Sequence, residues 1–135
     1  MVTYTNDDIK LISLFEKITH AQVKDLFLQQ QPIFVVAPGE LGKALGKNKM
    51  NLFRLENMLK KRVKVVEFSD SVLQFVLNVI APLKVTDIKQ EDKIIILTGN
   101  DMKTRGYLIG RNASNLRNTE AIVKHYFPID EIKVV

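Results

Sequence analysis

The sequence predicts an α+β protein built from two copies of one α-β-β-α-α-β unit. The first observation is an internal repeat: a shift of 64 positions lays the second half of the chain on the first, and a repeat of this kind decides how the fold divides. The second observation is that helical and strand patterns follow one another in the same order in both halves. The repeat matches Gly42 with Gly106, Leu45 with Ile109, Gly46 with Gly110, Lys47 with Arg111, Asn48 with Asn112, Asn51 with Asn115, Leu52 with Leu116, Glu56 with Glu120 and Lys60 with Lys124.

The first half shows helix, strand, strand, short helix, longer helix and strand, at about residues 5–18, 23–30, 33–37, 40–46, 50–61 and 63–68. Thr5 and Asp8 form a capping pair that opens the first helix. The second strand is the β-branched run "IFVVA" after Pro32. The segment "KNK" before the longer helix is predicted to be a loop, and the leucines of that helix share one face: Leu52, Leu55 and Leu59.

The second half repeats this order, with elements predicted at about residues 70–81, 84–90, 93–99, 101–110, 113–127 and 130–135. Pro82 and Pro128 lie at predicted boundaries, where a missing N–H group does least harm. We therefore expect a first domain at residues 1–69 and a second domain at residues 70–135.

The composition narrows the class of protein. Lysine and arginine number 20 against 15 acids, and the net charge of +5 favours an acidic partner. The absence of cysteine excludes disulfides, thiolate nucleophiles and cysteine metal sites, and is consistent with a reducing compartment. The stretch "MVTYTNDDIK" has acids where a signal peptide has basic and apolar residues, and no apolar run reaches the roughly 18 residues of a membrane span. These features predict a soluble, cytoplasmic protein with no membrane partner.

The segments "LGKNKMN" and "IGRNASN" occupy matched places between the two later helices of each half. Two helices joined by a glycine loop, preceded by two strands and followed by one, resemble the type II KH domain. The tandem arrangement resembles the RNA-binding half of the transcription factor NusA, and the whole chain resembles the short archaeal NusA-like proteins, which consist of two KH units. The resemblance implies a three-stranded sheet in each unit with helices packed on one face, and a function in transcription elongation or termination.

In KH domains the loop reads G-x-x-G and holds the sugar-phosphate chain of single-stranded RNA, while bases lie across a neighbouring apolar groove. Lys49 and Ala113 stand at the second glycine position in this chain. The resemblance implies single-stranded RNA as the ligand, RNA polymerase as a candidate protein partner, and no cofactor. The RNA-binding residues that it implies are Leu45, Gly46, Lys47, Asn48, Lys49, Ile109, Gly110, Arg111, Asn112 and Ala113.

The physical chemistry of the loops agrees with this expectation. Each loop runs into a helix N-terminus, where unpaired N–H groups and the positive end of the helix dipole attract phosphate. Glycine suits this place because a Cβ would collide with the ligand or forbid the turn. Residues 43–64 carry eight basic side chains against one acid, Glu56. We therefore expect the first loop to attract phosphate more strongly than the second, and we add Arg54 to the predicted RNA contacts.

Two other classes of function remain open. An enzyme acting on a phosphorylated substrate would need a catalytic constellation, but there is no Walker or dinucleotide-binding string and no cluster of ligands around His20 or His125. We therefore predict a protein that is not an enzyme, with no catalytic or metal-binding residues. A protein-interaction adaptor of the transcription or translation machinery, with only weak RNA contact, would be compatible with the altered second glycines. Tyr107, beside the second loop, could stack on a base, but we expect it to pack inside its unit.

Overall fold

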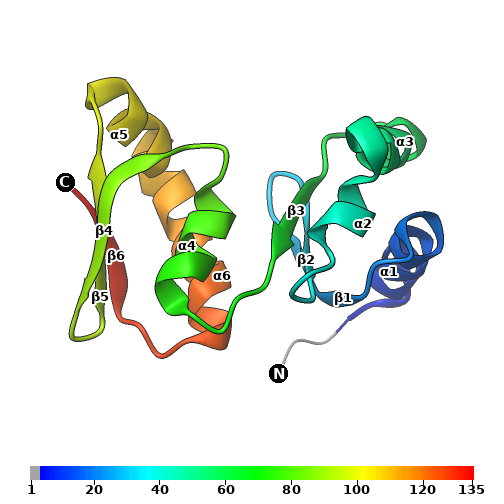
Figure 1. Ribbon diagram of the computed structural model, residues 1–135, viewed down its shortest axis with the longest axis horizontal. Coiled ribbons are helices and arrows are strands. Elements are labelled where there is room, and N and C mark those ends of the chain that lie inside the picture. Colours follow the sequence, from blue (N-terminus) through cyan, green and yellow to red (C-terminus); the bar gives the residue numbers. More distant parts are fainter. Residues whose placement is uncertain (1–3) are drawn as a thin grey trace. The chain divides into compact units, whose positions relative to one another are not determined.

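Each half of the chain folds as an α-β-β-α-α-β unit, which confirms the predicted class and the predicted order of elements (Figure 1). The computed structural model describes residues 4–135. The chain divides between Phe68 and Ser69 into two compact units. The first unit contains α1 (Asn6–Thr19), β1 (Val23–Leu28), β2 (Pro32–Val36), α2 (Leu41–Leu45), the 3₁₀ turn η1 (Lys47–Lys49), α3 (Met50–Leu59) and β3 (Lys64–Glu67).

The second unit has the same elements in the same order. It contains α4 (Val72–Ile80), β4 (Val85–Glu91), β5 (Ile94–Gly99), α5 (Met102–Ile109), the 3₁₀ turn η2 (Arg111–Ala113), α6 (Ser114–Tyr126) and β6 (Glu131–Val134). The first helix, α1, has 14 residues. Within residues 4–135, no helix is long and apolar enough to cross a membrane.

Both sheets have the same mixed topology. In the first sheet β2 lies in the centre, antiparallel to β1 and parallel to β3, and Phe34 is paired with Leu26 on one side and with Val65 on the other. In the second sheet β5 takes the central place between β4 and β6. Figure 1 shows the helices of the first unit together on one side of their sheet, as the KH resemblance implies.

The core of the first unit fixes the two helices that flank its loop. The rings of Phe15 and Phe34 stack with centroids 4.1 Å apart. Ala44 on α2 and Leu55 on α3 are completely buried in the same cluster. Leu52 and Leu59 pack against this cluster, so the leucine face predicted for α3 is confirmed. The loop between Ala44 and Leu55 is thus held at both ends by core residues.

The second unit holds its loop in the same way. Leu108 on α5 and Val123 on α6 are buried on either side of the loop. The ring of Phe75 on α4 is completely buried and lies 5.3 Å from the ring of Tyr126 at the end of α6. Buried apolar residues therefore hold the helices on both sides of the second loop.

Side-chain caps define the starts of α1 and α5. The hydroxyl of Thr5 accepts from the backbone N–H of Asp8 at 3.1 Å, and the Asp8 carboxylate accepts from the N–H of Thr5 at 3.0 Å. The predicted capping pair is therefore a full capping box. Asp101 caps α5 by accepting from the N–H of Thr104 at 2.7 Å. This second cap fixes the start of the helix that leads into the second loop.

Candidate nucleic-acid interface

The first loop, residues 46–49, is a tight turn that reverses the chain between α2 and α3. Gly46 ends α2, and its N–H donates to the carbonyl of Gly42 at 2.9 Å. Gly46 has φ 75° and ψ 174°, a region of the backbone map that is open almost only to glycine. Asn48 and Lys49 follow with φ 53° and 60°, and α3 begins at Met50. The segment predicted as a plain loop is thus a turn in which three of the four residues have a positive φ.

The second loop, residues 110–113, repeats this turn closely. Gly110 has φ 75° and ψ 176°, and Asn112 and Ala113 have φ 56° and 61°. Lys49 and Ala113 therefore adopt the left-handed conformation at the position where the KH loop has its second glycine. A residue with a Cβ is disfavoured there by about 1–2 kcal/mol. A second glycine would remove this cost, but the turn forms without one in both units.

An asparagine that was not among the predicted site residues braces each turn. The side-chain amide of Asn51 donates to the carbonyl of Lys43 at 2.9 Å, and that of Asn115 donates to the carbonyl of Tyr107 at 2.8 Å. Each bond joins the start of the helix after the loop to the last turn of the helix before it. The signal that could have indicated this role was the repeat itself, which matches the two asparagines.

The braces also explain the first glycine of each loop. A Cβ on Gly46 would lie 2.8 Å from Cγ of Asn51, and a Cβ on Gly110 would lie 2.6 Å from Cγ of Asn115. Of the two reasons that the sequence offered for glycine, the turn itself is the one that these distances support. The turn needs glycine whether or not a ligand approaches.

Polar side chains of the loops are available at the surface. Lys47, Asn48 and Lys49 are exposed in the first loop, and Arg111 and Asn112 are exposed in the second. In the described part of the chain, the backbone N–H groups of Lys47, Asn48, Arg111 and Asn112 donate no hydrogen bond. Lys49 and Ala113 instead use their N–H groups inside the turn, to the carbonyls of Gly46 and Gly110. Each loop thus offers two backbone donors and at least one cation.

The remaining predicted contacts are less exposed, with one exception. Leu45 and Ile109, the last residues of the helices before the loops, are partly buried, as is Ala113. Arg54 is exposed on α3, one turn beyond the loop. The predicted site residues therefore gather around each loop within its own unit.

The charge count over residues 43–64 overstates the cations available to the first loop. The amine of Lys43 lies 3.2 Å from the carboxylate of Glu40, so this charge is balanced. Lys64 belongs to β3, and its partial burial lowers its pKa. The charge count missed the first fact because Glu40 lies just outside the counted segment, and it missed the second because burial depends on the sheet. The cations that remain beside the loop itself are Lys47 and Lys49.

The expectation that Tyr107 packs inside its unit is wrong. Its side chain is 55% exposed, while the next residue along α5, Leu108, is buried. Successive side chains on a helix point about 100° apart, so one of two neighbours often faces solvent. Tyr107 therefore lies at the surface beside the second loop, and its carbonyl carries the Asn115 brace.

Comparisons with known proteins identify relatives by sequence and one similar solved structure. No family model matches the chain. The chain is 30% identical over 138 residues to a Methanocaldococcus jannaschii protein named "Probable transcription termination protein NusA", and the match covers 99% of this chain and 75% of that protein. Proteins of the same name from Methanococcus vannielii and Halococcus morrhuae are 30% and 29% identical, and the matches cover 80% and 98% of their lengths. The crystal structure of APE1850 matches 98% of this chain with a TM-score of 0.72 at 21% identity, which supports the fold.

Two mixed three-stranded sheets, each with a braced glycine turn between its later helices, define a protein of the tandem type II KH class. The match with named relatives along nearly the whole chain is more specific. The chain belongs to the archaeal family of proteins named probable transcription termination protein NusA, and the family resemblance stated from the loop segments is confirmed.

Proposed function

We propose that this protein binds single-stranded RNA through its two loops and takes part in transcription elongation or termination. The observation that carries the proposal is the repeated loop, which presents two backbone N–H groups and exposed basic side chains at the start of a helix in both units. Donors and positive charge at a helix N-terminus suit phosphate groups. We propose that residues 1–69 and 70–135 are the two KH domains that carry these loops.

In this proposal the loops hold the sugar-phosphate chain and the neighbouring apolar residues take the bases. Lys47 and Lys49 neutralise phosphates at the first loop, and Arg111 does so at the second. Leu45 and Ile109 line the apolar surfaces against which unpaired bases pack. Arg54, one turn further along α3, extends the positive surface of the first loop. Unpaired bases are needed because the bases of a duplex are stacked and paired and cannot reach such a surface.

The role in transcription rests on the relatives. Their printed name is that of a transcription termination protein. A protein that holds nascent transcript at two points would alter how the RNA leaves the polymerase, which is the step that elongation and termination share. We propose RNA polymerase as a further partner, and a binding function without catalysis.

Fluorescence anisotropy over a series of salt concentrations tests RNA binding. Each phosphate contact should contribute about 0.7 to the slope of log affinity against log salt for a single strand. We expect single-stranded RNA to bind more tightly than a duplex of the same length, and the Lys47→Glu, Lys49→Glu variant to lose both affinity and slope. Equal binding of duplex, or an affinity that does not depend on salt, would overturn the proposal. Binding to polymerase without RNA binding would favour an adaptor.

A further inference from the structure

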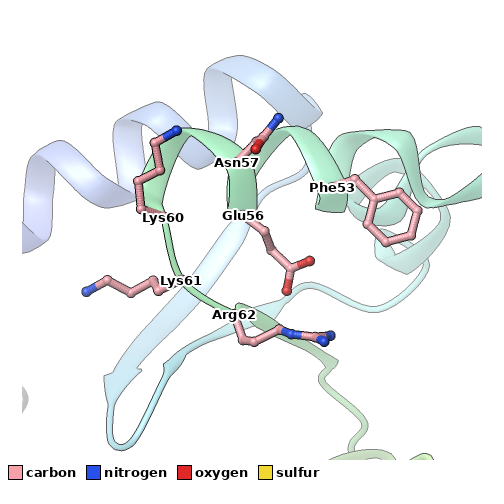
Figure 2. A pocket seen from close by; sticks show the side chains of 6 residues that line it. All are labelled: Phe53, Glu56, Asn57, Lys60, Lys61 and Arg62. Atoms are coloured by element: carbon pink, nitrogen blue, oxygen red, sulfur yellow. The ribbon is translucent and has the colours of Figure 1, made fainter.

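A shallow pocket of about 520 Å³ lies at the end of α3, outside the first loop. Figure 2 shows the side chains around it, with the carboxylate of Glu56 between the ring of Phe53 and the guanidinium of Arg62. The pocket joins an aromatic ring, an acid, an amide and three cations. Its lining residues are Phe53, Glu56, Asn57, Lys60, Lys61 and Arg62.

Phe53 is 58% exposed, although a residue with so large an apolar side chain is normally buried. Phe53 follows Lys49 by four residues, so it lies about 6 Å further along the helix axis. Asn57 follows at the same spacing and shares its face of α3. The pocket thus begins one helical turn beyond the first loop and extends away from it.

The carboxylate of Glu56 is only half used by the protein. Its Oε2 accepts from the backbone N–H of Val63 at 2.9 Å, which fixes α3 to the start of β3. Within the described residues, its Oε1 has no hydrogen-bond or ion-pair partner. An acceptor oxygen with a fixed position therefore faces the pocket beside an exposed ring.

The second unit closes the corresponding place. Glu120 matches Glu56 in the repeat, and its Oε2 accepts from the N–H of Ile132 at 2.7 Å. Its Oε1 is bound by the guanidinium of Arg117 at 2.7 Å, and Arg117 matches Phe53. The carboxylate that the second unit neutralises is left open in the first, and an aromatic ring replaces the neutralising cation.

We propose that this pocket binds one base of the RNA strand that leaves the first loop, and that it selects bases carrying an amino group. The proposal rests on the proposed RNA-binding function. Phe53 would stack on the base, because aromatic rings stack on bases of single strands. The Oε1 of Glu56 would accept from the exocyclic amino group of cytosine, adenine or guanine. Arg62, Lys60 and Lys61 would neutralise the adjoining phosphate.

An acidic peptide is a poorer occupant of the same pocket. It would satisfy the three cations, but it would place a carboxylate near the open oxygen of Glu56, and like charges repel. Uracil is also disfavoured, since it has no amino group and its one ring N–H donor is flanked by two carbonyl oxygens, which the carboxylate repels. The pocket therefore fits an amino-bearing base with its phosphate better than it fits either alternative.

Phe53→Arg tests the pocket against simple electrostatics. The variant copies the second unit, so the new guanidinium should pair with Glu56 and fill the place of the base. If only charge matters, the added cation strengthens RNA binding, whereas the pocket predicts that affinity for short adenosine or cytidine oligonucleotides falls about tenfold. Met58→Arg adds the same charge on α3 outside the pocket, where Met58 is 55% exposed, and should not weaken binding. Melting temperatures check that both variants stay folded.

Base preference supplies the second measurement. The parent should bind adenosine or cytidine oligonucleotides about tenfold more tightly than uridine oligonucleotides, and Glu56→Gln, which keeps an acceptor for Val63, should lose this preference. Unchanged or tighter binding by Phe53→Arg, while Lys47→Glu, Lys49→Glu weakens binding, overturns the pocket and leaves the loop proposal standing. No RNA binding by the parent overturns both. Displacement of the oligonucleotide by an equal concentration of adenosine monophosphate would show a mononucleotide site and overturn the pocket as part of an RNA path.

Discussion

The side-chain amide of Asn51 donates to the backbone carbonyl of Lys43 at 2.9 Å and joins the two helices that flank the first loop. The residues are eight apart in the sequence, and the bond spans the whole turn between them. The second unit makes the same bond from Asn115 to Tyr107 at 2.8 Å. Both turns are therefore braced by a hydrogen bond within the protein itself.

Asn51→Ala should destabilise the protein by about 1 kcal/mol, the usual net contribution of one hydrogen bond. It should also raise the rate of amide hydrogen exchange at Gly46 and Lys49, whose N–H groups are hydrogen-bonded in the turn, because the turn loses its brace. Asn57→Ala is the control, since Asn57 is exposed on the same helix. A melting temperature for Asn51→Ala equal to that of the control would show that the brace contributes nothing.

The glycine inside α5 and the glycine that caps its end should respond to alanine in opposite ways. Gly110→Ala places a Cβ 2.6 Å from Cγ of Asn115 at φ 75° and should cost about 1–3 kcal/mol. Gly106→Ala adds a Cβ that meets nothing within 4 Å on α5 and should stabilise by up to about 1 kcal/mol. Chemical denaturation measures both. Equal effects at the two positions would contradict the account of the turn.

In the second loop a glycine can be placed at the position where the KH loop has its second glycine. Ala113→Gly should stabilise the protein by up to about 1 kcal/mol, because the relief of a left-handed alanine exceeds the added flexibility of glycine. Ala121→Gly is the matched control, because Ala121 lies exposed inside α6 and should lose about 1 kcal/mol. A loss at both positions would mean that the left-handed conformation of Ala113 carries no strain.

The elements could be predicted from the sequence because each has a periodic apolar pattern, as the leucines of α3 illustrate. The braces could not, because Asn51 acts on a carbonyl whose position depends on the finished turn. The charge count failed for Lys64 for a related reason, because burial is set by neighbours in space. It failed for Lys43 because the partner, Glu40, lies just outside the counted segment. Tyr107 and Phe53 were not foreseen as surface rings, since composition alone does not say which face of a helix is covered.

Stability should fall in acid partly because of Asp101. The hydrogen bond from the N–H of Thr104 lowers the pKa of this carboxyl from its ordinary value of 3.8. A carboxyl group whose pKa is lowered on folding stabilises the folded state. This contribution is fully present at pH values above the ordinary pKa of 3.8, and it is lost as the pH falls through the pKa of the folded state. Asp101→Asn keeps the helix cap but cannot titrate, so its stability should vary less with pH below 4 than that of the parent. Parallel curves for the two proteins would contradict this assignment.

The two loops should differ in the number of phosphates they neutralise, and salt dependence can count them. The first loop exposes Lys47 and Lys49, and the second exposes Arg111 alone. For a single strand each lost phosphate contact lowers the slope of log affinity against log salt by about 0.7. Lys47→Ala, Lys49→Ala should therefore reduce the slope by about 1.4, and Arg111→Ala by about 0.7.

Alanine is the informative replacement in both loops, because it removes a cation without adding an acid that repels RNA. A further variant, Lys49→Arg, tests whether Lys49 acts on RNA binding through its charge. This variant should keep the slope of log affinity against log salt, because it keeps both the cation and the Cβ. Melting temperatures should stay close to that of the parent, because all three side chains are exposed. An equal reduction of the slope by Arg111→Ala and by the double variant would contradict this prediction. The second loop would then hold as many phosphates as the first, and the exposed cations would not be the groups that set the salt dependence.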